Sequence, residues 1–394
     1  MSTLPDSVTI LERLVSFPTI SRQPNADLIV YVDTVLRAAG AATRIVVHSG
    51  TGNLNLYAIV GPVDQAGVLL SGHTDVVPIA GQDWSSDPFR LTERDRRLYG
   101  RGTADMKGFV ACAISAALRA SSRPLARPLH LALSCDEEIG CVGVRSLLPV
   151  LAGIAPKPAL CIVGEPTSLR IATGHKGKIA MEAHFHGEAG HSASAPLFAN
   201  AIHLAADFVT RLRAYQAELA GRGRTDPDYE IPYSTLHAGI IRGGEALNIV
   251  PDHCTVAFEA RLVAGEDEDA LLARIHADAA AVADLERGRF PNARADVEVV
   301  NRYPGLNLPP DSDAVRFVTA LTGRNSLGKV AFGTEAGLFH GELGIPALVC
   351  GPGSMDQGHK ADEFIARDEV AACDAMLDRL IERLCRPAGL SPLQ

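Results

Sequence analysis

Five side chains suited to metal binding each lie at the end of an apolar segment or in the loop beyond it. They are two imidazoles and three carboxylates: His73, Asp105, Glu138, Glu165 and His359. Nitrogen and oxygen ligands without cysteine suit zinc, with cobalt or manganese as substitutes. Asp105 can bridge two cations through its two oxygens. The set therefore predicts a dinuclear centre, in which the ions lower the pKa of a shared water and polarise a carbonyl.

A histidine and an aspartate stand two residues apart after the apolar segment Gly67–Leu70. Alternate residues of an extended chain point to the same side, so the side chains of His73 and Asp75 project together. We therefore predict that His73 is a metal ligand and that Asp75 is the acidic partner that fixes the tautomer of its ring.

Three adjacent acidic residues, Asp136-Glu137-Glu138, follow the apolar segment Leu129–Leu133. Most runs of this kind are solvated surface loops, and that alternative stands beside the functional one. The preceding strand favours a position at the end of a sheet, where α/β active sites are built. Because neighbouring side chains diverge, one glutamate can bind metal while the other stays available as a general base.

The loop Tyr99–Gly108 carries Asp105 between glycines, directly before a predicted helix. Loops of this kind often bind phosphate. Here the Gly-x4-Gly-Lys-Ser/Thr pattern is absent and the centre of the loop is acidic, which favours a cation instead. His359 also follows a Gly-rich loop, one that begins at Gly351 and can fold back over a site.

These residues need a scaffold of alternating strands and helices. The first and last parts of the chain show this alternation. It predicts an α/β catalytic domain with a largely parallel sheet over residues 1–172 and 305–394. The order between them is β-α-β-β-α-β, the ferredoxin-like arrangement. We predict that residues 173–304 form this inserted domain, with the Pro/Gly-rich segment 303–310 as the return hinge.

The bulk properties disfavour several classes of function. The chain has 394 residues, enough for two domains. Its formal net charge of −9 disfavours nucleic acid or an anionic membrane as a partner. The sequence shows no secretory signal and no membrane span of about 18 apolar residues. Its eight cysteines are scattered without a C-x-x-C pair, which predicts reduced thiols and a cytoplasmic protein.

The motifs resemble the M20 family of metallopeptidases over essentially the whole chain, and most closely its acetylornithine deacetylase branch. The segments that carry the resemblance are Ser71–Pro78, Gly81–Trp84, Leu98–Phe109, Gly164–Thr167 and Gly351–Glu363. The resemblance implies two zinc ions, replaceable by cobalt. Each ion is held by one pair of residues, and the two pairs are joined by a bridging aspartate: His73 with Glu165, Glu138 with His359, and Asp105 between them.

The resemblance also assigns roles around the metals. It implies that Glu137 is the general base and that Asp75 orients His73. It further implies a cis peptide bond at Asp105–Met106. Glu335 could meet a cationic substrate side chain or serve as a structural residue, and Lys176 could hold a carboxylate or lie in a hinge.

The inserted domain contributes substrate contacts by the same resemblance. His191 would cross from the partner subunit of a homodimer, joined through this domain, and donate to the oxyanion of the reaction. Asn248 and Arg261 match substrate-binding residues, and arginine suits a carboxylate because its fork binds both oxygens. Gly333 and Thr334 match substrate contacts near the metals.

The implied activity is hydrolysis of the amide bond of N2-acetyl-L-ornithine, which yields acetate and L-ornithine for arginine biosynthesis. Another small N-acyl amino acid is an alternative substrate, as in succinyl-diaminopimelate desuccinylase. A non-catalytic, metal-stabilised binding protein is the alternative from a different class. Its mark would be a missing ligand or base, and none is missing from the sequence.

Overall fold

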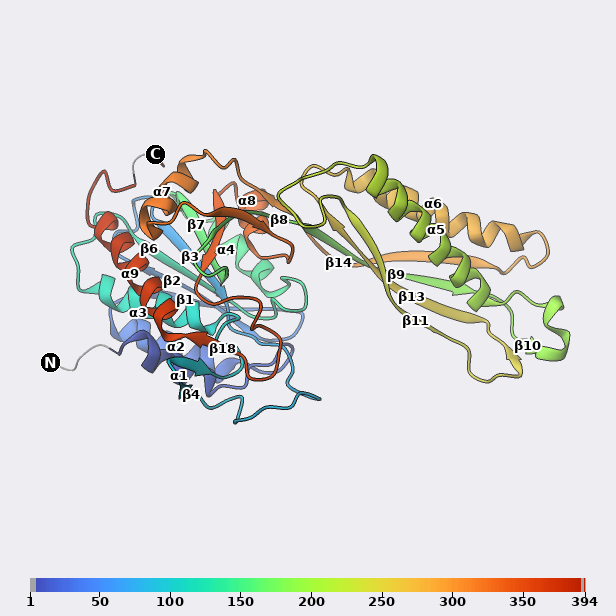
Figure 1. The fold of residues 1–394 in the computed structure, drawn as a ribbon, viewed down its shortest axis with the longest axis horizontal. Helices are drawn as coiled ribbons and strands as arrows, with labels where there is room; N and C mark the ends of the chain where they lie inside the picture. Colours follow the sequence, from blue (N-terminus) through green and yellow to red (C-terminus); the bar gives the residue numbers. More distant parts are fainter. Residues whose placement is uncertain (1–4, 391–392, 394) are drawn as a thin grey trace. The chain divides into compact units, whose positions relative to one another are not determined.

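The computed structural model describes residues 5–390 and 393, and the chain divides into two compact units (Figure 1). Unit 1 contains the residues up to Gly174, Leu306–Val330, and the residues from Thr334 on. Unit 2 contains His175–Gly305 and Ala331–Gly333. The predicted fold class is confirmed: a mixed α/β body with a mostly parallel central sheet, and an inserted βαββαβ segment.

Unit 1 is built around one large sheet with the strand order β1-β2-β6-β3-β7-β17-β8-β15, and β16 pairs with β8. Its strands are β1 (Ala42–Val47), β2 (Leu54–Val60), β3 (Val68–His73), β6 (Leu129–Ser134), β7 (Leu160–Pro166), β8 (Ile171–His175), β15 (Leu306–Asn307), β16 (Leu327–Val330) and β17 (Ala347–Gly351). The four central strands, β6, β3, β7 and β17, run parallel, whereas β1, β2 and β8 pair antiparallel. The carboxyl ends of the four parallel strands therefore meet at one edge.

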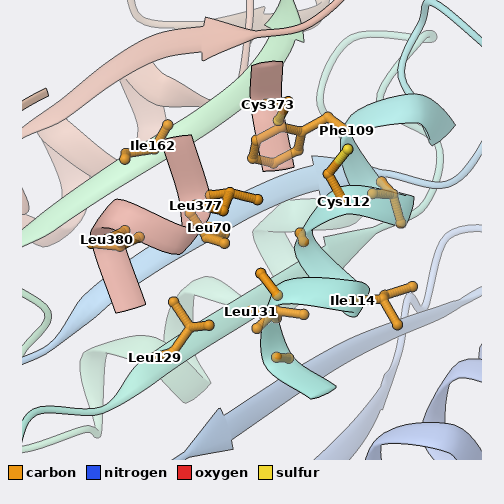
Figure 2. Close-up of a cluster of buried hydrophobic side chains, with 14 of the residues drawn as sticks. Leu70, Phe109, Cys112, Ile114, Leu129, Leu131, Ile162, Cys373, Leu377 and Leu380 are labelled. Atoms are coloured by element: carbon orange, nitrogen blue, oxygen red, sulfur yellow. The ribbon is translucent and has the colours of Figure 1, made fainter. Parts of the chain in front are cut away.

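Helices cover the sheet of unit 1. They are α1 (Ser7–Val15), α2 (Ala26–Ala38), α3 (Lys107–Ser121), α4 (Leu148–Ala152), α7 (Asp313–Thr322), α8 (Ala336–Leu343) and α9 (Arg367–Leu384). Helix α3 is apolar on nearly every side because it lies between the central strands and the outer helices α1 and α9. Figure 2 shows this core, with Phe109 and Cys112 of α3 beside Leu70 and Leu131 of the sheet and Leu377 of α9.

Unit 2 is a four-stranded antiparallel sheet in the order β11-β13-β9-β14. Its main elements follow the predicted order: β9 (Gly177–His186), α5 (Ala201–Arg222), β11 (Thr235–Gly243), β13 (His253–Leu262), α6 (Glu268–Arg287) and β14 (Arg294–Tyr303). The strands β9 and β13 alternate buried and half-buried residues because α5 and α6 pack against one face of the sheet. A short ribbon, β10 (Gly190–His191) with β12 (Ile249–Val250), completes the unit.

The segment Ile79–Gly102 is rich in glycine, aspartate and proline and contains two short strands. They are β4 (Thr92–Arg94) and β5 (Arg97–Tyr99), and β18 (Phe364–Ala366) pairs with β5 from far along the chain. Three-residue strands carry too little periodicity to stand out in a sequence. Among the helices that the structure describes, none is long and apolar enough to cross a bilayer.

Candidate metal centre

The five predicted ligands all come from the edge of unit 1 where the parallel strands end. His73 is the last residue of β3, and Glu165 lies near the end of β7. Glu138 follows β6, and His359 follows β17. Asp105 stands just before α3, and its peptide bond to Met106 is cis, as the resemblance implied. Gly164 is required beside Glu165, because an added Cβ would lie 1.9 Å from the ring of Phe109.

Asp105 lies between the two histidines. Its Oδ1 is 3.0 Å from Nε2 of His73, and its Oδ2 is 3.2 Å from Nε2 of His359. The carboxylate is 4% exposed. Each of its oxygens thus serves one imidazole, which is the arrangement that a carboxylate shared between two cations needs.

The other two carboxylates complete two neighbouring groups. Glu138 lies 3.0 Å from Nε2 of His359, and Glu165 lies 4.0 Å from Nε2 of His73. Ligands at about 2.0–2.2 Å from a tetrahedral zinc stand about 3.4 Å from one another, close to these spacings. The structure therefore brings all five residues together, and their nitrogen and oxygen donors could hold divalent metal.

Burial and mutual hydrogen bonds shift the pKa values of the side chains in this cluster. Hydrogen bonds to Asp105 and Glu138 raise the pKa of His359 to about 10. Burial, together with Asp105, raises the pKa of Glu138 to about 7. Burial opposes ionisation of Asp105, but its bonds to His359 and His73 outweigh burial and lower its pKa. Bound cations would replace the protons that these side chains hold.

Asp75 supports more of the site than the sequence suggested. Nδ1 of His73 donates to the backbone carbonyl of Asp75 at 2.9 Å, while the nearer carboxylate oxygen is 3.6 Å away. A neutral His73 then presents the lone pair of Nε2 to a metal. The Asp75 carboxylate itself accepts the amides of Glu137 at 3.0 Å and Glu138 at 3.3 Å, and the hydroxyl of Ser21 at 2.7 Å. It therefore positions the two glutamates.

Glu137 lies beside His73 and Glu165, with ligand atoms of the three residues within 4.8 Å of one another. Burial raises the pKa of Glu137 to about 8, and the thiol of Cys141 donates to its Oε1 at 3.0 Å. A buried carboxyl with this pKa can hold and release a proton near neutral pH. From the sequence, Cys141 was predicted only to be one of eight reduced thiols. Its spacing of four residues from Glu137 was the one signal of this contact.

The acidic run is not a solvated loop. Asp136 is 0% exposed, and its carboxylate accepts the amide of Arg22 at 2.6 Å, the hydroxyl of Thr51 at 2.6 Å and the Asn53 side chain at 2.9 Å. These donors come from well before the run in sequence. Asp136 thus anchors the segment that carries Glu137 and Glu138, and the surface-loop alternative is wrong.

Two residues that the sequence left open now have partners. Glu335 is 1% exposed, burial raises its pKa to about 7, and the hydroxyl of Ser71 donates to it at 3.1 Å. This bond places Glu335 beside β3, and its other oxygen, Oε1, is buried with no hydrogen-bond partner among the described residues. Lys176 lies in unit 2, where its ammonium donates to the carbonyls of Ile231 at 2.8 Å and Tyr233 at 2.7 Å. It therefore holds a loop of that unit.

Unit 2 brings His191 and Asn248 together. The ribbon pairs His191 with Ile249, and the amide of Ser192 donates to the carbonyl of Asn248 at 3.0 Å. Nδ1 of His191 accepts the amide of Ala193 at 3.1 Å, so in the neutral ring the proton lies on Nε2. His191 is exposed, and its Nε2–H is a donor suited to a developing oxyanion.

Arg261 also belongs to unit 2. Its guanidinium donates to Glu259 at 2.8 Å and to the hydroxyl of Tyr303 at 3.1 Å, and these partners fix its orientation. Gly333 packs against Tyr303, where an added Cβ would lie 2.1 Å from the hydroxyl oxygen. Thr334 is buried in unit 1, and its hydroxyl accepts the amide of Ala336 at the start of α8.

A second group of metal-type side chains lies on the sheet of unit 2. Nε2 of His184 is 3.7 Å from Glu182 and 3.5 Å from Glu298. The side chain of His184 is 28% exposed, that of Glu182 40% and that of Glu298 65%. None of these three residues is among the metal ligands predicted from the sequence.

The chain is similar to known proteins over nearly its whole length. Residues 69–383 match the profile of peptidase family M20/M25/M40. The chain is 36% identical to an acetylornithine deacetylase of Myxococcus xanthus, covering 97% of this chain and 98% of that one. It is 35% identical to an acetylornithine deacetylase of Proteus mirabilis, with 97% of each covered. Among solved structures, an M20 family metallo-carboxypeptidase from Sulfolobus solfataricus has a TM-score of 0.77 at 19% identity, with 97% of this chain and 99% of that one covered.

Proposed function

The chain belongs to peptidase family M20/M25/M40, and on this premise we propose that it hydrolyses N2-acetyl-L-ornithine to acetate and L-ornithine, a reaction of arginine biosynthesis. Full-length relatives at 33–36% identity with the name acetylornithine deacetylase support this substrate. The observation that carries the proposal is the placement of Asp105 between His73 and His359, with one oxygen toward each.

Two divalent cations, zinc or in its place cobalt, complete this site in the proposal. His73 and Glu165 would hold one ion, Glu138 and His359 the other, and Asp105 would bridge them. When bound, such ions polarise the amide carbonyl and lower the pKa of a water between them. The chain fits them with nitrogen and oxygen donors that are buried, except for a half-exposed His359.

Glu137 is the proton carrier in this proposal. It takes a proton from the attacking water and passes it to the nitrogen of ornithine as the amide C–N bond breaks. The oxygen of that water becomes part of acetate, so one water is consumed for each amine released. Asp75 keeps Glu137 in place through its amide and holds His73 through a backbone carbonyl.

The inserted domain supplies the remaining contacts in this proposal. His191 of a second copy of the chain donates to the oxyanion, and Arg261 and Asn248 hold the α-carboxylate of the substrate. Gly333 is the last residue of unit 2 along the chain and Thr334 belongs to unit 1, and both would contact the substrate near the metals.

The second copy would pair through unit 2. Strand β11 is an edge strand, and its Ile240 and Ile241 are 50% and 52% exposed. Leu247 is fully exposed on the loop that follows. Exposed apolar residues on a sheet edge are typical of a surface that pairs with another chain. We propose a cytoplasmic homodimer, and the eight free cysteines fit a reducing compartment.

A release assay tests the proposed function. The chelated protein is given zinc or cobalt, and the released acid is measured. It is acetate from N2-acetyl-L-ornithine and other N-acetyl amino acids, and succinate from N-succinyl-L,L-diaminopimelate. We expect fastest turnover on acetylornithine and none without metal. Faster release of succinate would transfer the proposal to the succinyl substrate. Metal binding without release from any substrate would favour the non-catalytic alternative.

A further inference from the structure

Glu363 joins the two loops of the metal centre. It is 1% exposed, and its carboxylate accepts four hydrogen bonds from the segment that ends at Asp105. Oε1 accepts the amides of Ala104 at 2.9 Å and Asp105 at 3.0 Å. Oε2 accepts the amide of Gly102 at 3.1 Å and Nη1 of Arg101 at 2.8 Å. One side chain thus fixes the backbone of the residue between the two histidines.

A second set of bonds connects the same segment to His359. The side chain of Gln82 donates to the carbonyl of His359 at 3.0 Å, and its oxygen accepts from Arg101. Arg101 also donates to the carbonyl of Lys360 at 3.3 Å. Glu363 lies four residues after His359 in the chain. Asp105 and His359 are therefore linked in two ways, through the hydrogen bonds of Glu363 and through those of Gln82 and Arg101.

We propose that Glu363 is a positioning residue that sets the Asp105 backbone in register with His359, so that a cation meets both side chains without rearrangement. The proposal rests on the proposed function in taking Asp105 and His359 as ligands. Residues that orient metal ligands in this way typically account for about 10- to 100-fold in metal affinity or activity.

The chemistry of the four donors explains why a carboxylate stands here. An ionised carboxylate accepts at both oxygens and donates at neither. Glutamine has nearly the same shape, but its amide group would face two N–H donors with a further donor. Aspartate is one methylene shorter and would reach the loop less well. Glu363→Gln therefore removes the function of the side chain while conserving its volume.

Metal affinity is the decisive measurement for this variant. Zinc affinity of purified Glu363→Gln is measured by competition with a chromogenic chelator, beside metal content and circular dichroism. We expect the variant to be folded. Of its two zinc sites, the one with the lower affinity should bind zinc about 10- to 100-fold less tightly than in the wild-type protein. We also expect a fall in kcat larger than any change in KM, and recovery of kcat when zinc is raised. A structural residue without a positioning role would not show this recovery.

Asp374→Asn is the matched control. Asp374 is a partly buried carboxylate of unit 1 that accepts from Ser7 at 2.7 Å and Arg119 at 3.2 Å, away from the metal centre. We expect this variant to melt at a lower temperature and to keep wild-type zinc affinity. Gln82→Ala serves as a second, milder test if Glu363→Gln does not fold, with an affinity loss of a few fold.

Two results would overturn the inference. One is a folded Glu363→Gln protein with wild-type zinc affinity and kcat. The other is an equal loss of zinc affinity in Asp374→Asn. A wild-type protein that binds zinc but releases no acetate would overturn the proposed function alone, because the affinity comparison still tests Glu363.

Discussion

Two groups of histidine and carboxylate side chains differ in how the fold holds them. In unit 1 the side chains of His73, Asp105, Glu138 and Glu165 are 1–9% exposed, whereas that of His359 is 44% exposed. The five residues come from separate segments that meet at one sheet edge. In unit 2 the side chains of Glu182, His184 and Glu298 are 28–65% exposed and come from two adjacent strands. The residue types are the same, so type alone does not distinguish these two candidate groups.

The difference lies in what surrounds the side chains. In unit 1, Asp75 accepts the amides of Glu137 and Glu138, and Glu363 accepts the amide of Asp105, so the backbone of these three residues is fixed. In unit 2, Glu182 stands directly opposite Glu298 in the strand register, and water can solvate both carboxylates. Preorganised, buried ligands lose little freedom when a cation binds, whereas exposed ones must give up water and mobility. We therefore expect tight binding only in unit 1.

Asp105→Ala is expected to have the largest effect. Removing a residue that only orients a metal ligand lowers metal affinity by up to about 100-fold. Loss of the shared carboxylate should weaken metal binding at both sites by more than this, and activity should disappear with the metal. Metal content after dialysis and acetate release measure both effects. Two tightly held ions in this variant would contradict the role of Asp105 and remove the contrast between the units.

Glu137→Gln should separate metal binding from catalysis. Without its proton carrier the enzyme should lose about 10²- to 10⁴-fold in kcat, because general acid–base catalysis typically supplies that much. The variant should still hold both metals. The check is the steady-state rate of acetate release, measured together with metal content. A wild-type kcat in this variant would show that Glu137 is not the general base.

His191→Ala should show whether His191 of unit 2 takes part in the reaction. Loss of one oxyanion donor typically lowers the rate by about 10²- to 10³-fold. The variant should stay folded and dimeric in light scattering. Mixing it with a Glu137→Gln protein should restore part of the activity if the histidine acts across subunits. Full activity of His191→Ala alone would argue against this role.

The metal affinity of the group in unit 1 should depend on pH. His359 has a pKa raised to about 10, so at pH 6–8 it carries a proton that a cation must displace. Affinity should therefore rise with pH, by about tenfold per unit for each proton released. Chelator competition at pH 6, 7 and 8 measures the slope, and a flat profile would conflict with the raised pKa of His359.

His184→Ala should have the smallest effect. We expect unchanged metal content, zinc affinity and kcat within about twofold, because the exposed group in unit 2 lacks the buried support of unit 1. The measurement is metal stoichiometry beside the wild type. A lost equivalent of zinc in this variant would show that the exposed group binds metal after all.

Much of the fold and of the candidate site follows from the sequence. The apolar segments before His73, Glu138 and Glu165 predicted strand ends, and the order of elements in residues 173–304 predicted the inserted fold. These signals are local: a strand or a helix shows its period within a few residues, and a ligand shows its chemistry by its type.

Tertiary structure alone decided how the ligands are held. The sequence placed Asp75 beside His73, but folding directs its carboxylate to the amides of Glu137 and Glu138, more than sixty positions away. Glu363 reaches Asp105 across 258 positions, and β18 pairs with β5 across a similar distance. No local period encodes such contacts, because they exist only once the strands and helices have packed and brought distant backbone donors to one carboxylate.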